Sequence, residues 1–570
     1  MTGGPAAAAR RCYDQRTSFE GPPILIRLLL CLSVALTGAG AVHGDTAEAL
    51  RVWLEGLDAG GGAEVHGEPL HHPDLVAGVY RDRDHRPLWT GDGPLAGQRA
   101  ALAAAVEASA LHGLNPAAYH ADALATVKDP LAIELLATDA FLTQARHRAT
   151  GAVSPRALDP EWFLIAPEVD ARALLDLAAR GEADVGALLE DLWPDNDEYR
   201  RLLEERARIL ALGETSTARV PAGPLIRPGD SGERVLALKE RLLGPGEHTP
   251  IYDTELGEAV RAFQRGAGLE PDGIVGPASL EVMNASRFSW IDRIDANLER
   301  WRWLPAHQPD TYLRVNIAAF SLRVIQANED ALRMDVIVGR PYRRTPVFTE
   351  TIKYLVLNPD WNVPWKIAVQ DKLPDLKADA SKLAAQGYEV RLEGSDTFVP
   401  VDQVDWTPVT RGNFRHLLRQ RPGPMNALGQ VKFMLPNPHA VYLHDTPNRD
   451  LFAKQERGFS SGCVRLSRPL ELADWLLRND GQTSQAARIR ELLDGGETTT
   501  IYLRQPLPTY LVYFTAFTDE AGEVIFRRDL YERDGAIVAA LRAGGRAGGS
   551  AGGPAGGLAS YPAGSTGALP

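Results

Sequence analysis

Two residues close together in the sequence have side chains suited to nucleophilic chemistry. His444 lies in the run 441–444, whose alternation predicts a strand with Tyr442 and His444 on one face. Cys463 follows nineteen positions later (463 − 444), in the glycine-containing segment 459–465. An imidazole that accepts the thiol proton, or pairs with the thiolate, turns a cysteine into a good nucleophile. The pattern therefore predicts Cys463 as a nucleophile with His444 as its base.

The neighbours of Cys463 favour the same chemistry. The guanidinium of Arg465 would stabilise a nearby thiolate, and Gly462 would let the chain approach a substrate closely. Backbone N–H groups at Ser461, Gly462 and Cys463 are candidate donors to a tetrahedral oxyanion.

The first 44 residues look like an export signal. Four arginines precede the apolar run 28–36, and the small residues 39–41 offer an A-x-A cleavage site. We expect residues 1–44 to be a signal peptide or, as the alternative, an anchor helix, and the true start could lie downstream of Met1. Cys12 and Cys31 belong to this leader, so its removal would leave Cys463 as a lone thiol in an oxidising compartment. A lone thiol there indicates chemistry, with an inert buried cysteine as the alternative.

Length and charge exclude several classes of protein. The chain has 570 residues, which predicts about three to five domains, and its 44% apolar and 24% charged residues are typical of globular proteins. The net charge is −13 and no long basic run occurs, so no nucleic-acid partner is expected. No stretch of 20 uncharged apolar residues occurs, which excludes a polytopic membrane protein and leaves only the N-terminal segment for membrane contact.

Residues 45–220 are expected to form a mostly helical scaffold domain. The run 131–150 lacks Pro and Gly and is followed by Gly151, which predicts a helix and its end. We find no cluster of titratable residues in this part of the sequence. Four histidines of this region are interpreted as ordinary core residues: His71, His72, His112 and His147.

Residues 225–286 carry two short amphipathic patterns with turn signals between them. Asp230 or Ser231 is a candidate cap for the first helix, and Asp253 or Thr254 for the second. The motif consists of Gly229-Asp230-Ser231-Gly232, Val235, Leu238, Tyr252-Asp253, Ala259-Val260, Phe263-Gln264, Gly268-Leu269, Asp272-Gly273 and Val275-Gly276-Pro277. It resembles the small helical peptidoglycan-binding module found beside wall enzymes, with a spacer that has lost binding as the alternative.

Within a domain expected over residues 290–540, the apolar pattern alternates with a period of two from about residue 310. This predicts several half-buried strands and a mainly β domain. Residues 366–422 are less regular and richer in charge, which is typical of an inserted lid. The glycine-rich tail 543–570 cannot bury enough apolar surface to fold and is expected to be disordered. The fold class is therefore multidomain α+β.

Five segments surround or contain the two reactive residues in the expected β domain: 358–364, 422–429, 432–433, 442–447 and 459–465. These segments resemble those of the L,D-transpeptidase family, and most of all its large Gram-negative, multidomain periplasmic branch. The resemblance implies a Cys463 nucleophile, a His444 base and neither metal nor cofactor. Many smaller members carry His at the position of Ser461, so this departure leaves His444 as the only base. Arg465 would steady the loop or meet a substrate carboxylate. The resemblance also places Asn358, Trp361 and Tyr442 on the cleft wall.

The family resemblance implies acyl transfer in the bacterial cell wall. Cys463 would attack the bond between meso-diaminopimelate and D-Ala of a tetrapeptide stem, and a second stem would resolve the thioester as a 3→3 crosslink. Implied partners are tetrapeptide stems, a D,D-carboxypeptidase and glycan-polymerising enzymes. The resemblance also implies the periplasm, a role in cell-wall biogenesis and cell shape, and inactivation by carbapenems.

Three other interpretations remain open at this stage. The segment 458–462 matches G-x-S-x-G, the nucleophile elbow of serine hydrolases, although no histidine follows His444. His444, Asp445 and Cys463 are possible zinc ligands, but no C-x-x-C or H-E-x-x-H accompanies them. The third interpretation is a wall-binding protein that kept the fold and lost turnover.

Overall fold

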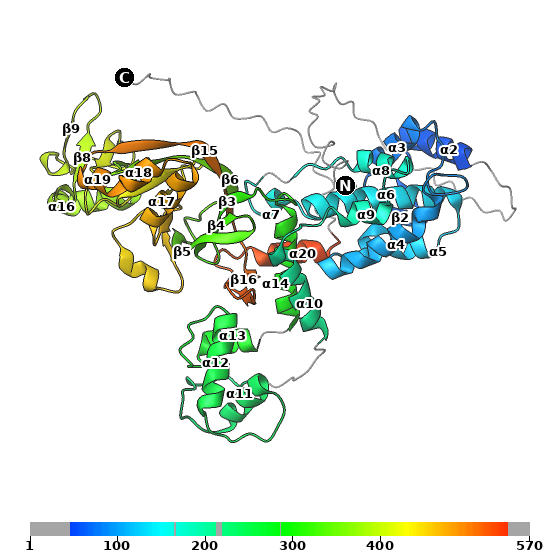
Figure 1. Ribbon diagram of the computed structural model, residues 1–570, viewed down its shortest axis with the longest axis horizontal. Helices are drawn as coiled ribbons and strands as arrows, with labels where there is room; N and C mark the ends of the chain where they lie inside the picture. The colour runs from blue at the N-terminus through cyan, green and yellow to red at the C-terminus, as the bar shows by residue number, and fades with distance from the viewer. Residues whose placement is uncertain (1–45, 165–166, 212–218, 285–286, 545–570) are drawn as a thin grey trace. The chain divides into compact units, whose positions relative to one another are not determined.

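The computed structural model describes residues 46–164, 167–211, 219–284 and 287–544, which form two compact units (Figure 1). The first unit contains residues 46–158, 168–193 and 539–544, and the second contains the described part of 159–538 that remains. The expected leader 1–44 and all but two residues of the expected tail 543–570 lie outside the described residues. Within the described chain, no helix combines the length and apolarity needed to cross a membrane.

The first unit is helical. Its helices are α2 (Thr46–Asp58), α3 (Pro73–Asp82), α4 (Arg99–Ala108), α5 (Ala121–Thr126), α6 (Pro130–Thr150), α7 (Pro155–Leu158), α8 (Ala171–Ala179) and α9 (Val185–Glu190), with short 3₁₀ turns η1 (Ala96–Gln98), η2 (Ser109–His112) and η3 (Pro116–Tyr119). The short strands β1 (Glu64–Val65) and β2 (Glu68–Pro69) form a hairpin. The predicted helix 131–150 is confirmed: Asp129 caps α6, and Gly151 follows its last residue.

Helix α6 is the centre of this unit, because α2, α3, α4, α5 and α8 all pack against it. Its side chains are buried all round, as expected for a helix enclosed by others. Two fully buried carboxylates, Glu134 and Asp139, accept hydrogen bonds from loops that reach the helix. Glu134 accepts the N–H groups of Leu88 and Trp89 at 2.8 and 2.9 Å. The buried carboxylates of α6 thus hold the neighbouring loops in place by hydrogen bonds, which apolar side chains cannot form.

The second unit contains a small three-helix module with its own core. The helices are α11 (Glu233–Leu243), α12 (Thr254–Gly266) and α13 (Pro277–Met283). Asp253 caps α12, as predicted, by accepting the Leu256 N–H at 3.0 Å. The prediction for α11 is wrong, because its N-terminal flanking residue is Gly232 and no side chain caps it. The Asp230 carboxylate instead accepts the Arg227 N–H at 2.7 Å within the preceding turn.

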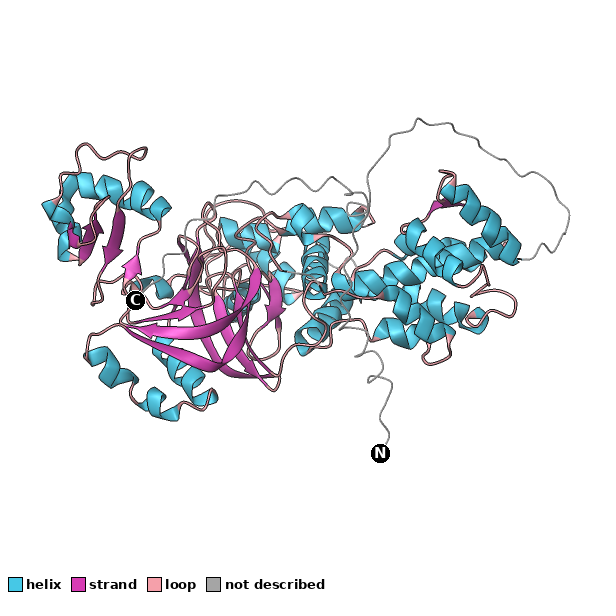
Figure 2. Ribbon diagram, turned by 90° about the horizontal axis from the view of Figure 1, so that it is seen from above, coloured by secondary structure: helices cyan, strands magenta, loops and turns pink. Residues whose placement is uncertain are grey.

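The largest sheet of the second unit has nine strands and is the large central group of magenta strands in Figure 2. Its strands, in spatial order, are β13 (Gly458–Ser460), β5 (Glu329–Gly339), β14 (Val464–Leu466), β12 (Leu443–His444), β11 (Val431–Met434), β6 (Phe348–Leu357), β15 (Thr499–Val512), β3 (Thr311–Asn316) and β4 (Ser321–Gln326). Strand β4 also pairs with β5, which closes the sheet on itself. Buried and less buried residues alternate in β11 and in the second half of β6, in agreement with the sequence pattern, whereas β3 is buried at five consecutive positions, 312–316.

Several helices and one hairpin complete the second unit. They are α10 (Asp197–Ala211), α14 (Arg287–Arg302), α17 (Pro469–Asn479), α18 (Thr483–Ala487), α19 (Ile489–Asp494), the turn η6 (Arg449–Ala453), the hairpin β16 (Ala516–Thr518) and β17 (Val524–Phe526), and α20 (Asp534–Arg542), which runs across the division between the units. The multidomain α+β class predicted from the sequence is confirmed.

The inserted segment is more regular than its sequence suggests. It contains a separate four-stranded sheet in the order β7 (Trp361–Asn362), β10 (Leu417–Gln420), β8 (Tyr388–Arg391) and β9 (Phe398–Pro400). Its helical parts are α15 (Trp365–Ile367), the π-turn η4 (Ala368–Lys372), α16 (Leu373–Ala385) and η5 (Val401–Gln403). A hydrophobic core of its own, from Trp361 to Leu428, lies between them. The segment is therefore a small subdomain, which extends beyond 366–422 at both ends.

Candidate active site

The sheet register brings the two reactive side chains to one face. Strands β12 and β14 are parallel neighbours in which His444 lies beside Arg465. The ladder continues back to Tyr442, whose carbonyl accepts the Val464 N–H at 3.1 Å. Since alternate residues share a face, Tyr442 and His444 lie on the same side as Cys463 and Arg465. His444 and Cys463 are thus diagonal neighbours, with Cα atoms about 7–8 Å apart in such a pairing.

Strand β11 adds a lysine to this face. Lys432 pairs with His444 across the antiparallel ladder, and its Nζ lies 4.2 Å from the centre of the Tyr442 ring. Burial lowers the pKa of Lys432, while the neighbouring Cys463 acts in the opposite direction. We did not single out Lys432 as a site residue from the sequence. Its position as a polar residue between the buried Val431 and Phe433 was the available signal, but only the strand register shows what it faces.

The loop before Cys463 is fixed by hydroxyl groups. The buried Ser460 Oγ accepts the Gly462 N–H at 3.0 Å and donates to the Cys463 carbonyl. Thr345 Oγ1 donates to the Gly462 carbonyl at 2.8 Å. Gly462 has φ +121°, a value that side chains strongly disfavour, so the turn requires glycine. The loop is therefore held in one conformation from both sides.

Cys463 is a half-buried free thiol among hydrogen-bond donors and cations. Burial raises the pKa of the Cys463 thiol, while hydrogen bonds from the Tyr442 backbone and hydroxyl act against this, as do the charges of Lys432 and Arg465. The Sγ atom lies 3.8 Å from the Ala440 carbonyl oxygen. With its pKa raised, the thiol holds its proton at neutral pH and needs a base to become a nucleophile.

His444 is suited to be that base. The side chain is 4% exposed, and its Nδ1 bonds to the Asp445 carbonyl. A carbonyl only accepts, so the neutral ring carries its hydrogen on Nδ1 and leaves a lone pair on Nε2. Burial, followed by the charges of Arg465 and Lys432, lowers the pKa of His444 to about 3. The imidazole is therefore neutral and able to accept a proton at neutral pH.

Two aromatic residues connect the thiol to the inserted subdomain. Tyr442 packs against the subdomain core that contains Trp361, and its hydroxyl lies close enough to the Cys463 sulfur for each group to affect the pKa of the other. The Tyr442 and His444 rings meet edge to face with their centres 5.6 Å apart. Trp361 belongs to β7, the strand at which the subdomain sheet begins. Of the three residues expected on the cleft wall, Tyr442 thus lies beside the thiol and Trp361 lies beside Tyr442.

Arg465 faces the same site without an acidic partner among the described residues. Its Nε atom is buried and has no hydrogen-bond partner there. Burial lowers the pKa of Arg465, and the charge of Arg340 acts in the same direction. Two cations, Arg465 and Lys432, therefore lie near the thiol with little solvent around them. Such a pair favours an anionic ligand.

Ser461 is exposed and takes part in a different contact. Its Oγ lies 3.0 Å from Arg343 Nη1. The same guanidinium binds the Asp371 carboxylate with both nitrogens, at 2.5 and 2.7 Å, and Gln370 at 3.0 Å. The Arg343 hydrogen bond holds the pKa of Asp371 below its usual value. Since Asp371 and Gln370 lie in the subdomain turn η4, Arg343 joins the subdomain to the nucleophile loop.

Asn358 is placed away from this group. Its Nδ2 donates to the carbonyls of Leu492 and Leu493 at 3.1 Å each and to Glu497 at 3.3 Å. Its own carbonyl accepts from Thr498 Oγ1 at 2.7 Å. The amide therefore closes the C-terminal end of α19, and the structure does not bring Asn358 to the thiol.

The geometry does not favour a serine or zinc site here. Ser460 is buried in the loop and bonded as described, and the next element is a strand rather than the helix of a nucleophile elbow. The Asp445 carboxylate accepts the Gln430 and Thr446 N–H groups and binds Arg449, on the face opposite His444. Among the described residues, the one group able to offer three metal ligands lies in the first unit and contains neither His444 nor Cys463.

Comparison with known families identifies three regions of the chain. Residues 310–491 match the family described as "L,D-transpeptidase catalytic domain", residues 74–205 match "Scaffold domain", and residues 231–283 match "Putative peptidoglycan binding domain". The chain thus carries an L,D-transpeptidase catalytic domain together with a scaffold and a peptidoglycan-binding domain. These domains indicate association with the cell wall, and the resemblance of the catalytic segments to the L,D-transpeptidase family is confirmed.

Two curated relatives and one solved structure are similar to parts of the chain. A Haemophilus influenzae protein named "Putative L,D-transpeptidase" is 35% identical over 245 residues, which are 43% of this chain and 48% of the relative. The Bacillus licheniformis "N-acetylmuramoyl-L-alanine amidase CwlL" is 36% identical over 77 residues, 12% of this chain and 21% of the relative. The chain thus spans less than half of either relative. A crystal structure of the L,D-transpeptidase from Xylanimonas cellulosilytica is 14% identical, with a TM-score of 0.15, over 51% of this chain and 98% of that one.

Proposed function

We propose that the protein is a peptidoglycan L,D-transpeptidase that forms 3→3 crosslinks between meso-diaminopimelate residues through a thioester on Cys463. The observation that carries this proposal is the placement of Cys463 and His444 on one face of adjacent strands. The free lone pair on His444 Nε2 supports the role of base. The match of residues 310–491 to the transpeptidase domain supports the reaction class.

In the first half-reaction, Cys463 Sγ forms a bond to the diaminopimelate carbonyl carbon while its proton moves to His444 Nε2. The tetrahedral intermediate then collapses, the C–N bond to D-Ala breaks, and the same proton passes to the leaving amine. The Gly462 N–H already donates to Ser460 Oγ, so the expectation that it meets the oxyanion is replaced. We assign that role to the N–H groups of Ser461 and Cys463.

In the second half-reaction, the amine of another stem attacks the thioester carbon. His444 takes the proton of that amine, and the sulfur leaves as the thiol once the proton returns to it. Attack by water instead gives hydrolysis, and attack by another amine gives exchange. The neutral state of His444 suits both halves, because the ring must accept a proton twice.

Lys432 and Arg465 supply positive charge that can bind the carboxylates of a peptide stem. Tetrapeptide stems carry carboxylates, and two cations with little solvent around them favour such groups. We assign Arg465 the binding of a stem carboxylate. We assign Lys432 the role of holding the Tyr442 ring and lowering the pKa of the thiol against the effect of burial.

The inserted subdomain is proposed to act as a lid on this face. Arg343 connects Asp371 of the subdomain to Ser461 of the nucleophile loop, and Trp361 connects it to Tyr442. A closed lid would exclude water from the thioester and favour attack by an amine. The peptidoglycan-binding module would hold the enzyme on its substrate, and a periplasmic location with a D,D-carboxypeptidase and glycan-polymerising enzymes as partners follows from that substrate.

The test is incubation of the purified full-length protein with disaccharide-tetrapeptide, followed by mass spectrometry of the products. We expect a crosslinked dimer and released D-Ala. A carbapenem is expected to add its mass to the protein, which separates an enzyme from a wall-binding protein without turnover. His307→Gln, at an exposed loop position, is the matched control for changes at His444. Dimer formation that survives in His444→Gln at the rate of His307→Gln would overturn the assignment of the base.

A further inference from the structure

The first unit contains a buried carboxylate, Asp139, that contacts a histidine ring in addition to the two backbone N–H groups it holds. Asp139 lies in α6 and is fully buried. Its Oδ1 accepts the His72 N–H and its Oδ2 accepts the His71 N–H, both at 2.9 Å. These two bonds fix the segment that leads into α3. The Oδ2 atom also faces His120 Nε2 at a distance of 2.8 Å.

His120 has a carboxylate at each of its ring nitrogens. Its Nδ1 lies 3.3 Å from Glu68 Oε2, while its Nε2 faces Asp139. A neutral imidazole has one N–H and can donate to only one of these acids. With the hydrogen on Nδ1, the Nε2 lone pair points at an oxygen lone pair, in a site where His120 is only 3% exposed. With the hydrogen on Nε2, the ring donates to Asp139 but turns its Nδ1 lone pair toward the partly exposed Glu68 carboxylate. Either neutral tautomer thus leaves one ring nitrogen facing a carboxylate without a hydrogen, and a second proton or a metal ion at Nε2 removes that mismatch.

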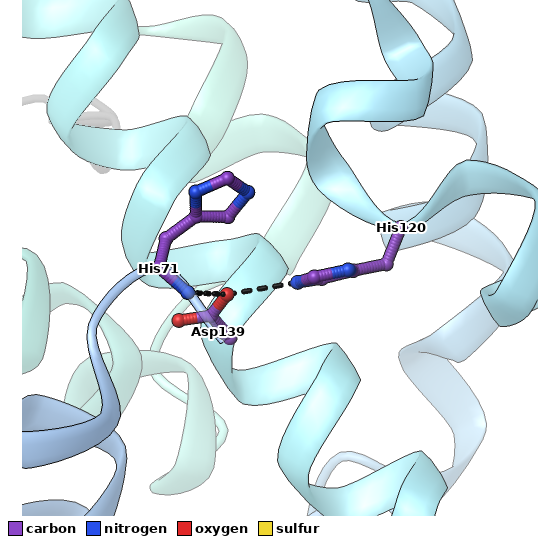
Figure 3. Close-up of side chains that lie close together, drawn as sticks. All are labelled: His71, His120 and Asp139. Atoms are coloured by element: carbon purple, nitrogen blue, oxygen red, sulfur yellow. Dashed lines mark hydrogen bonds and ion pairs between the residues drawn. The ribbon is translucent and has the colours of Figure 1, made fainter. Parts of the chain in front are cut away.

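His71 distinguishes between these two possibilities. One ligand atom from each of His71, His120 and Asp139 lies within 4.8 Å of the others. Figure 3 shows the three residues coming from separate segments, with dashed lines from the His71 backbone N–H and from the His120 ring to Asp139, and with the His71 ring lying to one side of that pair. The His71 and His120 rings are 5.4 Å apart between centres. A second proton on His120 would involve only His120 and Asp139 and would give the nearby His71 no role. A metal ion would use all three residues, because two imidazoles and a carboxylate are ligands typical of zinc.

We propose that His71, His120 and Asp139 bind one divalent transition-metal ion of the zinc class. His120 Nε2, Asp139 Oδ2 and a ring nitrogen of His71 are the ligands, and water completes the coordination. Glu68 accepts the Nδ1 hydrogen of His120 and orients the ring, which is the arrangement often found behind metal-bound histidines. The sequence expectation of an ordinary core histidine at His71 and of no titratable cluster in the scaffold is thereby replaced.

The ion would fasten three segments of the first unit together. His71 lies just before α3, His120 lies in the turn before α5 with a left-handed φ of +60°, and Asp139 lies in the middle of α6. These segments are distant in sequence, so their ligand atoms come together only in the folded unit. An ion that binds there binds the folded state in preference to the unfolded chain and therefore stabilises it. The proposal concerns the scaffold and is independent of the proposed transpeptidase reaction.

The test is a zinc titration of the full-length protein in a Cys463→Ser background, with any affinity tag removed, followed by calorimetry and metal analysis after dialysis. The key variant is His71→Gln, which keeps the backbone N–H bond to Asp139. His66→Gln, an exposed histidine of the same unit, is the matched control. Co²⁺ serves as a second probe, because its visible absorption reports nitrogen and oxygen ligands directly.

We expect one zinc ion per chain, a rise in the melting temperature of the scaffold on zinc addition, and at least tenfold weaker binding in His71→Gln. The His66→Gln control should bind as the parent protein does. Zinc binding at the same affinity in His71→Gln and His66→Gln would overturn the proposal. The absence of stoichiometric binding in the parent protein would overturn it too and would leave a second proton on His120 as the charge.

Discussion

His444 and His120 are both buried, yet their surroundings favour opposite charges. Around His444, burial and the cations Arg465 and Lys432 lower the pKa to about 3. Around His120, burial also favours the neutral ring, but the hydrogen bonds and charges of Asp139 and Glu68 outweigh it and raise the pKa. The same side chain is thus kept free to accept a proton in one region and bound to acids in the other. The comparison shows that burial favours the neutral ring in both regions, and that the neighbouring charges decide whether the pKa ends below or above its usual value.

The largest expected difference between the two regions is catalytic. His444→Gln removes the base, and we expect acylation by a carbapenem to slow on the order of 10²–10⁴-fold. His71→Gln, in the scaffold cluster, should leave the acylation rate of the folded protein unchanged. Stopped-flow measurement of acylation in both variants checks this, and equal losses in the two would remove the distinction between the regions.

The second difference concerns stability at low pH. The folded-state pKa of His444, about 3, lies below the value of about 6.5 expected in the unfolded chain. The unfolded chain therefore binds more protons between these values, so the contribution to stability is fully present above pH 6.5 and is lost as the pH falls toward 3. For this one group the slope is about 1.4 kcal/mol per pH unit.

Urea unfolding of the catalytic domain between pH 4 and 7 measures that slope. In His444→Gln the free energy of unfolding should depend less steeply on pH by this amount, whereas His307→Gln should behave as the parent protein. Identical slopes in His444→Gln and the parent would show that the imidazole is not kept neutral by the fold.

A smaller effect is expected where the subdomain meets the nucleophile loop. Arg343→Gln removes the paired hydrogen bonds to Asp371 and the contact with Ser461, so we expect a several-fold rise in the ratio of hydrolysis to transfer. Deletion of the insertion should raise it further. Arg411→Gln, an exposed arginine of the same subdomain, is the control. Product analysis by mass spectrometry gives the ratio, and an unchanged ratio in Arg343→Gln contradicts the lid.

The smallest predicted effect tests the electrostatic part of the comparison. Lys432 lowers the pKa of His444, so Lys432→Met should raise it and move the acid limb of the acylation rate upward by about half a pH unit. Lys454→Met, an exposed lysine outside the site, should leave the limb in place. A limb that does not move in Lys432→Met would mean that burial and Arg465 alone set the pKa.

The sequence predicted local features well. The absence of Pro and Gly from 131–150 and the glycine after Thr150 defined α6 to within one residue, and Asp253 was one of two candidate caps for α12. The motif around Cys463 and His444 was recognised because its residues lie close together in the chain. Local periodicity and capping chemistry suffice for such features.

Features that depend on distant pairing were missed. Lys432 faces the thiol only because β11 lies beside β12, and no local pattern determines that register. His71, His120 and Asp139 belong to three segments that meet only in the folded unit. The cap at Asp230 was wrong because its carboxylate bonds within its own turn. The charge-rich insertion looked irregular because its strands are short and pair out of sequence order.

The central claim is that the Cys463 sulfur carries the acyl group. The most direct test is rapid quenching of the full-length protein with a tetrapeptide stem, followed by peptide mapping by mass spectrometry. We predict that Cys463 gains the mass of the stem less D-Ala, that hydroxylamine removes it, and that Cys463→Ala forms neither adduct nor dimer. An adduct on Ser460 or Ser461, or dimers formed by Cys463→Ala, would contradict the account.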